Sequence, residues 1–424
     1  MAFLYRLCLL TLLLTGIANA QEPASNETPP QTDEGARIVE GRPALYTLKR
    51  NANPLTWIEL AVKPVFRFAE SDRIRNLATK KSGDQKTSGI RFGVDGDGTG
   101  SGLGPEVTLY HKDFLGRGIE VEIPLVYTYK RYERYQFLAT VPLHTSASGS
   151  RLSFDLGTGY DSRVRDDFFG VGNDSQRDDE SQLRTITREA SAGVTQQMAD
   201  NWSLGLHAVY RSVGVTEPRA GTSAQTRFES DSVPGLFGAT LRSAVFSVGR
   251  DSREREQYGY KGALDRFEVG FNQSARGSQF EYWSYRFDSQ HFFALTNDRR
   301  KVIAFRGLVE TNVATAGHDV PFFDMPFLGS QQTLRGFENF RFRDKSALAL
   351  TLEYRYRIWR LMDWGLFVDE GQVAPQLGDM AWNRFHTGYG ARIFLWPKPN
   401  LPISFDYGRS NETWRFYISV NKAF

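Results

Sequence analysis

The chain has one cysteine, Cys8, among its 424 residues, and no apolar run of about 18 residues after the N-terminus. A single cysteine cannot form an internal disulfide, and the lack of long apolar runs excludes membrane-spanning helices. The formal net charge is only +3, with both signs interspersed along the chain. This balance excludes the strongly basic surface that a nucleic-acid partner would require.

The sequence also lacks the motifs of common catalytic and metal sites. It contains no G-x-S-x-G and no H-E-x-x-H, and its six histidines are scattered. A Gly-rich run from 95 to 104 suggests a calcium or phosphate site, but it lacks the remaining EF-hand ligands and a strand–glycine–helix context. We interpret this run as a turn between two strands. We therefore predict no enzymatic activity, no metal site and no cofactor.

Residues 1–20 have the three parts of a secretory signal peptide. Arg6 gives a positive start, residues 7–14 form a short apolar core, and Ala18-Asn19-Ala20 is a small-x-small cleavage site. Cys8 lies inside the apolar core, so the mature chain would contain no thiol. An exported protein without thiols avoids mispairing in an oxidising compartment.

The next two segments differ in character from the rest of the chain. Residues 21–53 are polar and predict a linker. Residues 54–86 predict an amphipathic helical segment, because Leu55, Ile58 and Val62 begin an apolar face. Such a helix could lie on the surface of the inner leaflet, plug the barrel or pack on a barrel rim. We assign residues 87–424 to a β-barrel, for the reasons that follow.

From Gly89 onward the sequence contains about sixteen strand-like segments. In the clearest, from 119 to 130, apolar residues alternate with charged or polar ones. One apolar and one charged face in strand after strand are typical of a transmembrane antiparallel barrel, whose outer face meets lipid. Segments near Arg184, Thr240 and Glu281 alternate poorly.

The lengths of the connections predict the same fold. Connections after odd-numbered segments are long and those after even-numbered segments are short, as expected for an N-terminus on the periplasmic side. Only 251–262 is longer than this rule predicts. Inside such a barrel, His207 and His386 are expected to be solvated structural side chains. The long connections are 164–182, 213–234, 314–346 and 374–384, and the short ones include 199–201, 359–363 and 396–400.

The stretch from 321 to 373 carries the most specific pattern. Its loop contains Leu334-Arg335-Gly336-Phe337, and the strand that follows sets Glu353 opposite its apolar face. A second strand carries Phe367-Val368-Asp369-Glu370-Gly371. Either Arg335 is a solvent-exposed loop arginine, or the loop folds inward. We favour the inward loop, in which Arg335 makes a charge-assisted contact with Glu353 or Asp369.

These two motifs resemble the hallmark motifs of the BamA/TamA superfamily of outer-membrane barrels, the bacterial surface antigen type. The resemblance covers roughly residues 89–424, with Leu334 where the family motif has valine. It implies that the loop enters the lumen and that its arginine pairs with the strand aspartate. No βααββ pattern lies between 37 and 86, so the chain resembles a member without periplasmic POTRA domains. The implied site residues are Leu334, Arg335, Gly336 and Phe337 in the loop and Phe367, Asp369 and Gly371 on the wall; Glu353 joins them from the strand pattern alone.

The resemblance also implies a site where the barrel closes. In the family, weak pairing between the first and last strands lets the wall open sideways. In this chain the first strand is rich in glycine, which weakens pairing by removing side-chain contacts. A terminal phenylalanine, Phe424, resembles the signal read by the outer-membrane assembly machinery. The predicted lateral seam consists of Gly89, Phe92 and Gly93 in the first strand and Phe416 and Ile418 in the last.

Two functions from different classes follow. By resemblance, the protein assists insertion or translocation of protein or lipid across the bacterial outer membrane. Its partners would be outer-membrane lipid, client proteins and a separate periplasmic protein. The alternative is a passive pore or a structural surface barrel that keeps the fold without this activity. A protease or phospholipase is a weaker interpretation, because paired carboxylates such as Glu120 and Glu122 are better explained as residues that set the charge of the lumen.

Overall fold

The computed structural model describes residues 87–95, 104–199, 201–218, 221–228, 232–254, 261–359, 361–398 and 401–420. All of the described residues belong to one compact unit, residues 86–424. The predicted signal peptide, linker and amphipathic segment lie outside the described residues, as do most of the Gly-rich run and Phe424.

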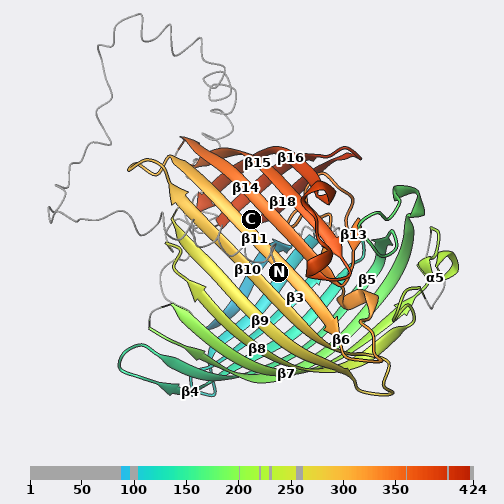
Figure 1. The fold of residues 1–424 in the computed structure, drawn as a ribbon. Helices are drawn as coiled ribbons and strands as arrows, with labels where there is room; N and C mark the ends of the chain where they lie inside the picture. The colour runs from blue at the N-terminus through green and yellow to red at the C-terminus, as the bar shows by residue number, and fades with distance from the viewer. Residues whose placement is uncertain are drawn as a thin grey trace, which may run out of the picture. The chain divides into compact units, whose positions relative to one another are not determined.

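Sixteen strands form one antiparallel sheet, in which each strand pairs with the next along the chain (Figure 1). β14 follows β11 in the sheet, because the two short strands between them pair with each other. Figure 1 shows the sheet wound round on itself, and β1 and β18 lie close together. The predicted all-β fold of about sixteen antiparallel strands is confirmed. The strands are β1 (Ser88–Asp95), β2 (Gly104–Phe114), β3 (Ile119–Tyr127), β4 (Glu133–Thr145), β5 (Arg151–Phe168), β6 (Ser181–Gln197), β7 (Trp202–Thr216), β8 (Gly238–Asp251), β9 (Gly262–Ser274), β10 (Glu281–Ala294), β11 (Lys301–Ala314), β14 (Ser346–Trp359), β15 (Met362–Ala374), β16 (His386–Lys398), β17 (Leu401–Arg409) and β18 (Trp414–Val420).

The helical elements are short and lie in the connections. No helix in the described ranges is both long enough and apolar enough to cross a membrane. The elements are η1 (Arg177–Asp179), α5 (Ala224–Arg227), η2 (Phe322–Asp324), η3 (Leu377–Asp379) and η4 (Trp382–Arg384).

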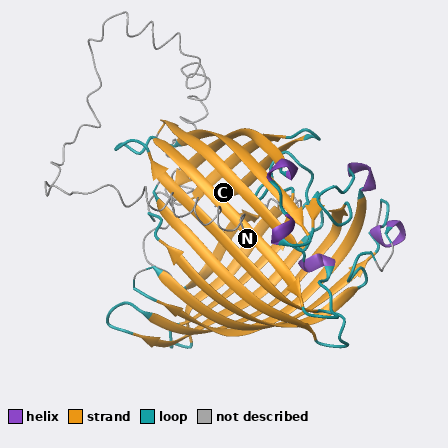
Figure 2. Cartoon of the chain, in the orientation of Figure 1, coloured by secondary structure: helices purple, strands orange, loops and turns teal. Residues whose placement is uncertain are grey.

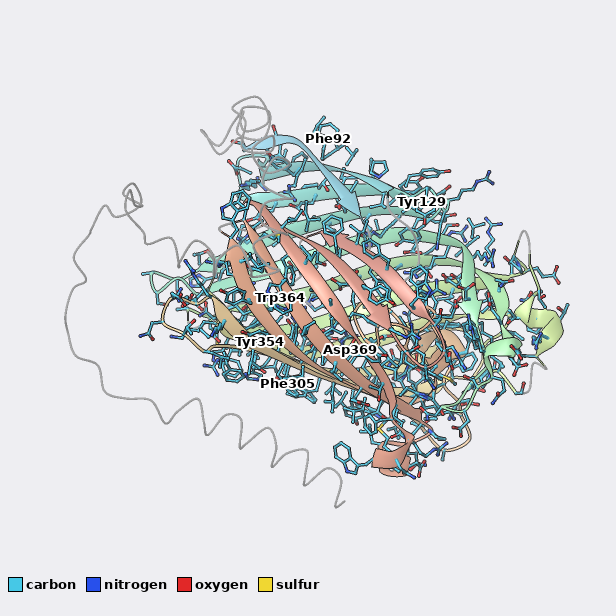
Figure 3. All side chains as sticks on the ribbon, turned by 90° about the horizontal axis from the view of Figure 1, so that it is seen from above. Phe92, Tyr129, Phe305, Tyr354, Trp364 and Asp369 are labelled. Carbon is cyan, nitrogen blue, oxygen red and sulfur yellow. The ribbon has the colours of Figure 1, made fainter. Side chains whose placement is uncertain are left out.

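Side chains alternate between the outside and the inside of the barrel along each strand. On β10 and β11, Phe287 lies opposite Val309 on the outer face. The intervening Asp288 faces inward, where it accepts a hydrogen bond from Arg306 Nε at 2.8 Å. An apolar outside and a charged inside are what a lipid-embedded barrel requires. Figure 3 labels three outer-face residues of neighbouring strands, Phe305, Tyr354 and Trp364, together with the inward-facing Asp369.

The three segments that alternate poorly in sequence are complete strands, β6, β8 and β10. Their outer faces become polar toward the end of the barrel that bears the long connections, where Arg188 and Arg242 are exposed. Glu281 occupies the corresponding first position of β10. At the edge of the lipid-facing band the outer face of a strand meets the membrane interface, so the apolar pattern is lost.

The long connections all leave the same end of the barrel, because they follow β5, β7, β11 and β15. These are the fifth, seventh, eleventh and thirteenth strands of the sheet, as the sequence predicts. The predicted boundaries are wrong by a few residues, since β5 continues to Phe168 and β7 to Thr216. A register shift between Arg163 and Asp166 interrupts alternation in β5 where the sequence predicts its end. β3 ends before Tyr129, which lies in the following turn.

The connection between β11 and β14, residues 315–345, is largely buried. It contributes Phe322 to an apolar cluster with Phe168 and Leu236, and Leu328 to a second cluster with Leu308. Figure 2 shows loops and short helices gathered at one end of the barrel. This buried connection, which we call the lumenal loop, positions the candidate site.

Candidate functional site

A small hairpin carries the loop motif into the barrel. β12 (Phe327–Leu328) pairs with β13 (Phe342–Arg343), so residues 329–341 form the tip of the lumenal loop. The hairpin lies against β14 and β15. All four predicted loop residues are in this tip, which is therefore held against the wall strands that carry the second motif.

Arg335 and Asp369 form a buried bidentate ion pair. Arg335 Nε donates to Asp369 Oδ2 and Nη2 donates to Oδ1, each at 2.7 Å. The backbone N–H of Arg335 donates to Oδ2 at 3.1 Å, and Thr351 Oγ1 donates to Oδ1 at 2.9 Å. The two charged residues are only 2% and 1% exposed. Asp369 thus accepts four hydrogen bonds, which replace the water that burial removes from its carboxylate.

Glu353 and Asp406 lie on the far side of the same guanidinium. Arg335 Nη1 is 3.6 Å from Glu353 Oε2 and 3.7 Å from Asp406 Oδ2, within ion-pair range but beyond a hydrogen bond. Glu353 accepts its hydrogen bonds from Arg355 Nε at 2.6 Å and Arg392 Nη1 at 3.1 Å. Arg392 Nε in turn donates to Asp406 Oδ1 at 2.6 Å. Glu353 is therefore part of the site, but its hydrogen bonds come from Arg355 and Arg392 of the wall and not from Arg335.

These side chains form one set, which we call the lumenal charge cluster. Its formal charges cancel, and this balance allows it to be buried, since an unpaired buried charge costs several kcal/mol. Although burial disfavours its charged form, the Asp369 carboxylate raises the pKa of Arg335 above its ordinary value. The members are Arg335, Arg355 and Arg392 against Glu353, Asp369 and Asp406.

Phenylalanine rings hold the guanidinium planes. The guanidinium carbon of Arg335 lies 3.3 Å from the centroid of the Phe367 ring, and that of Arg355 lies 4.7 Å from Phe394. A ring face attracts a cation and keeps water away from it. Phe367 and Asp369 are two residues apart on β15, so both face inward. Phe367 packs against the face of the Arg335 guanidinium, while Asp369 accepts hydrogen bonds from its edge.

Two glycines let the loop backbone lie directly against the wall. Gly336 has φ +92°, and a Cβ there would lie 2.5 Å from the carbonyl carbon of Arg409. On β16, a Cβ at Gly388 would lie 2.0 Å from the carbonyl oxygen of Arg335. A side chain at either position would force the loop tip off the wall.

Leu334 and Phe337 anchor the apolar side of the tip. Both are fully buried, in a cluster that also contains Leu328 and Val373. Gly371 of the strand motif makes room for this packing, because a Cβ there would lie 2.9 Å from Leu328 Cδ1. Every predicted loop and wall residue therefore contacts this one assembly.

His386 is not the solvated side chain that the sequence predicts. Its ring stacks on Phe342 with the centroids 3.8 Å apart, and its Nε2 lies 3.1 Å from the carbonyl oxygen of Asn173. The prediction is wrong because the lumenal loop fills the space beside the start of β16. His207 faces inward, with Nε2 3.3 Å from Thr195 Oγ1.

The lumenal loop is also tied to a distant part of the wall. Asp324 accepts a hydrogen bond from Arg211 of β7 at 2.6 Å and another from the Tyr282 hydroxyl of β10. On the other side, the backbone N–H of Gly336 donates to the Tyr417 hydroxyl of β18 at 3.1 Å. The loop therefore crosses the interior from β7 to β18.

A second charged loop residue lacks a direct acidic partner. Arg343 of β13 donates Nη1 to the carbonyl oxygen of Phe322 at 2.7 Å. Burial lowers the pKa of Arg343 to about 10, although Asp166 and Asp324 oppose this shift. Arg343 is thus held by a carbonyl and aromatic faces. The arginines of the lumenal charge cluster differ in that each of them also pairs with a carboxylate.

The predicted seam residues lie apart from this cluster, on the two end strands of the sheet. Among the described residues, ladders join β1 only to β2 and β18 only to β17. Within the described residues, β1 spans Ser88–Asp95 and β18 spans Trp414–Val420. The outward Phe92 is 78% exposed, which is high even for a lipid-facing side chain. The five positions are Gly89, Phe92 and Gly93 on β1 and Phe416 and Ile418 on β18.

Sequence reasoning missed half of the lumenal charge cluster. Alternation places Arg355 and Asp406 on inward faces, but it does not say which residues they meet. Arg392 lies opposite Asp406 only because of the register between β16 and β17. Gln331 also belongs to the site, since its Nε2 donates to Asp406 Oδ2 at 3.1 Å.

Three side chains that recur in hydrolases meet on the outer wall. Ser289 Oγ donates to Asp265 Oδ1 at 2.6 Å, and His291 Nε2 lies 2.9 Å from Ser289 Oγ. The same Nε2 faces Asp265 at 3.4 Å. A catalytic relay needs one ring nitrogen for the nucleophile and the other for the acid, so this arrangement cannot act as one. Within the described ranges, no group of three or more potential ligands is placed to hold a metal ion.

Comparisons with known proteins agree with this geometry. An Omp85 superfamily domain model matches residues 113–424. A search of curated protein sequences finds no match. BamA from Haemophilus ducreyi lacking POTRA domains 1–3 is similar in structure, with a TM-score of 0.61 and 17% identity over 80% of this chain and 71% of that one.

Two further solved structures share the fold. CdiB from Acinetobacter baumannii has a TM-score of 0.51 and 11% identity over 79% of this chain and 60% of its own. CdiB from Escherichia coli has a TM-score of 0.52 and 12% identity over 80% of this chain and 63% of its own. The chain thus spans less than two thirds of each CdiB structure, and at these identities the structural similarity shows a shared fold alone.

Proposed function

The chain belongs to the Omp85 superfamily of bacterial outer-membrane β-barrels, and from this premise we propose that it assists insertion or translocation of protein or lipid by parting β1 from β18. Family membership supports a function of the insertase or translocator type in general. The observation that carries the specific proposal is that, among the described residues, no ladder joins β1 to β18.

The seam is the weakest join in the wall. Each backbone hydrogen bond contributes about 0.5–1.5 kcal/mol net, so a short or absent ladder resists opening far less than the long ladder between β5 and β6. An edge strand with unpaired N–H and C=O groups is a template for another strand. A client strand can therefore pair with this edge by β-augmentation.

The two sides of the seam differ in how firmly they are held. β18 is tied to the lumenal loop through the Tyr417 hydroxyl and through the ion pair between Arg415 and Glu338. No hydrogen bond or ion pair joins the described residues 87–95 to that loop; Arg91 of β1 instead pairs with Glu122 of β3. We therefore assign β1 as the moving edge and β18 as the fixed one.

The lumenal loop weighs against a passive pore. It crosses the interior from Arg211 on β7 to Tyr417 on β18, and its tip is fixed in the lumenal charge cluster. A wide aqueous path would require this loop to leave its buried contacts. A structural barrel without activity is compatible with the loop, but it gives no reason for a weak seam.

The proposed partners are client proteins or lipid at the seam and a periplasmic protein that delivers them. A client would supply an extended strand with a free edge. Lipid would instead pass along the parted strands, where Phe92 and Phe416 are exposed on the outer face.

A disulfide across the seam tests the proposal. Phe92→Cys combined with either Phe416→Cys or Ile418→Cys would join β1 to β18. The matched control is Tyr407→Cys with Phe416→Cys, because these two residues face each other on β17 and β18 and their disulfide leaves the seam free. Each protein is placed in liposomes, oxidised, and supplied with a urea-unfolded small outer-membrane barrel. A parallel assay follows the transfer of a fluorescent phospholipid between leaflets.

The oxidised seam variant should lose client insertion or lipid transfer, and reduction should restore it. The control disulfide should change neither. Retained activity in the cross-linked seam variant would refute the moving-strand mechanism. Steady ion conductance in the wild type and the cross-linked variant, with no insertion or lipid transfer in either, would instead favour the passive pore.

A further inference from the structure

A groove of about 700 Å³ lies on the outer wall, over strands β3 to β7. Its floor is apolar where Leu125, Phe137 and Ala190 line it. Tyrosines stand along it, and the rings of Tyr135 and Tyr160 are stacked with centroids 6.0 Å apart. The groove is therefore shaped for a long apolar group, with aromatic side chains beside it.

An arginine lies at the rim of this groove, on the lipid-facing wall. Arg188 of β6 pairs with Tyr160 on one side and Ser212 on the other, and all three belong to the outer face. Its side chain is exposed and makes no hydrogen bond or ion pair with any described residue. A charged side chain on the outer wall of a barrel is destabilising unless it lies near a membrane interface or has a partner.

A second exposed cation lies beside it. Arg242 of β8 pairs with Tyr210 of β7, so the two arginines flank the same short stretch of β7 from opposite sides. The Arg242 guanidinium donates to Gln273 at 3.0 Å and remains exposed. Two cations next to tyrosines mark the level of an interface rather than of acyl chains.

Between the two arginines and the short connections, the outer wall is flat and apolar. Ala192 of β6 faces Ala208 of β7, which faces Ala244 of β8. Larger side chains, Leu156 on β5 and Phe246 on β8, border this strip. The order from the long-connection end is therefore cations with tyrosines beside them, and then a smooth apolar trough, which is the order of charge and chain in an anionic lipid.

We propose that this outer surface binds the phosphorylated glycolipid of the outer leaflet, lipid A. Its phosphate groups would lie on Arg188 and Arg242, and one acyl chain would occupy the groove. Guanidinium groups bind phosphate through charge-assisted, often bidentate hydrogen bonds. The long connections face the outside in this family, so the arginines lie at the level where the outer leaflet carries its phosphates. The site does not depend on whether the seam opens.

Titration of lipid A into the detergent-solubilised full-length protein, followed by native mass spectrometry, tests the site. Arg188→Gln with Arg242→Gln should weaken binding by about tenfold or more. The matched control is Arg250→Gln with Arg266→Gln. Arg250 lies on the outer wall beside Trp202 at the opposite end, and Arg266 is an exposed inward residue. This control removes the same charge and should leave affinity within about twofold.

A groove-filling variant, Ala190→Trp, keeps both arginines and should also weaken lipid A binding. Heat-modifiable migration on gels verifies that each variant is folded. Phosphatidylglycerol is titrated as a second probe, and it should bind the wild type more weakly than lipid A. The proposal is overturned if the double variant binds lipid A as well as the wild type, if the control loses as much affinity, or if phosphatidylglycerol binds equally well.

Discussion

Replacing Arg335 with alanine should free the lumenal loop without preventing the barrel from forming. The substitution removes both side-chain hydrogen bonds to Asp369, each at 2.7 Å, and the cation over the Phe367 ring. It also leaves two arginines against three acids in the lumenal charge cluster. The unpaired Asp369 then either stays buried at high cost or draws water and moves the loop away.

The expected loss follows from the burial of the pair. Breaking a buried ion pair by removing one partner costs about 3–5 kcal/mol, whereas an exposed pair is worth about 0–1 kcal/mol. We expect about 3 kcal/mol, because water can enter once the tip moves. At about 2–4 °C per kcal/mol this is a fall of roughly 6–12 °C in the thermal midpoint. The sixteen-strand ladder is untouched, so membrane insertion should persist.

Heat-modifiability on gels and limited proteolysis of the loop measure this effect. The Arg151→Ala variant is the matched control, since its partner Glu120 is 3.0 Å away but 48% exposed. The double variant Arg335→Ala with Asp369→Ala should lose less than the sum of the single losses, by about 1.5–3 kcal/mol. An Arg335→Ala protein as heat-stable and as protease-resistant as the parent would refute this reasoning, as would simple additivity in the double variant.

Three further outcomes follow from the loop contacts. Gly336→Ala should lower the thermal midpoint and expose the loop to protease, because Gly336 has φ +92° and a Cβ there would clash with the wall backbone. The control Gly378→Ala should do neither, because a Cβ at Gly378 would meet no atom within 4 Å. Arg211→Gln should loosen the first part of the loop, seen as faster cleavage near Asp324, at a cost below that of Arg335→Ala because Arg211 is partly exposed. Burial raises the pKa of Asp344, so its ionisation disfavours the folded state and stability should fall as pH rises above the unfolded value of about 4. Asp344→Asn should abolish that fall in a series of thermal midpoints against pH, and an unchanged pH profile would contradict the assignment.

Much of the fold was predictable because each strand of a barrel has one face toward lipid and one toward the lumen, so apolar and polar residues alternate along it. Alternation and the lengths of the connections predict about sixteen strands and the order of the long loops. The prediction was weakest for β6, β8 and β10, where outer positions such as Arg188 and Arg242 are polar. Strand ends at the membrane interface carry no apolar alternation in their sequence, so their limits are set by pairing with neighbouring strands instead.

The site was predictable only in part, because register decides which side chains meet. The motifs identify Arg335 and Asp369 directly. The partnership of Arg392 with Asp406 depends on the turn between β16 and β17, which the sequence places at 396–400. The structure has a register shift between Leu395 and Lys398, next to this turn. The shift changes which residues of β16 and β17 face each other along the rest of the ladder, including Arg392 and Asp406. A change of one or two residues in a turn exchanges one set of cross-strand neighbours for another.

The order of the chain gives the lumenal loop a further property. The acids and the phenylalanine that hold the Arg335 side chain belong to β14, β15 and β17, and all of these strands follow the loop in sequence. During biogenesis Arg335 is therefore made before any of its partners, whereas Asp324 and Glu338 of the loop have Arg211 and Arg177 within reach from the start. The contacts of Arg335 and Gly336 can all form only after β18 is in the wall, so a fully bound tip indicates that the last strand is in place.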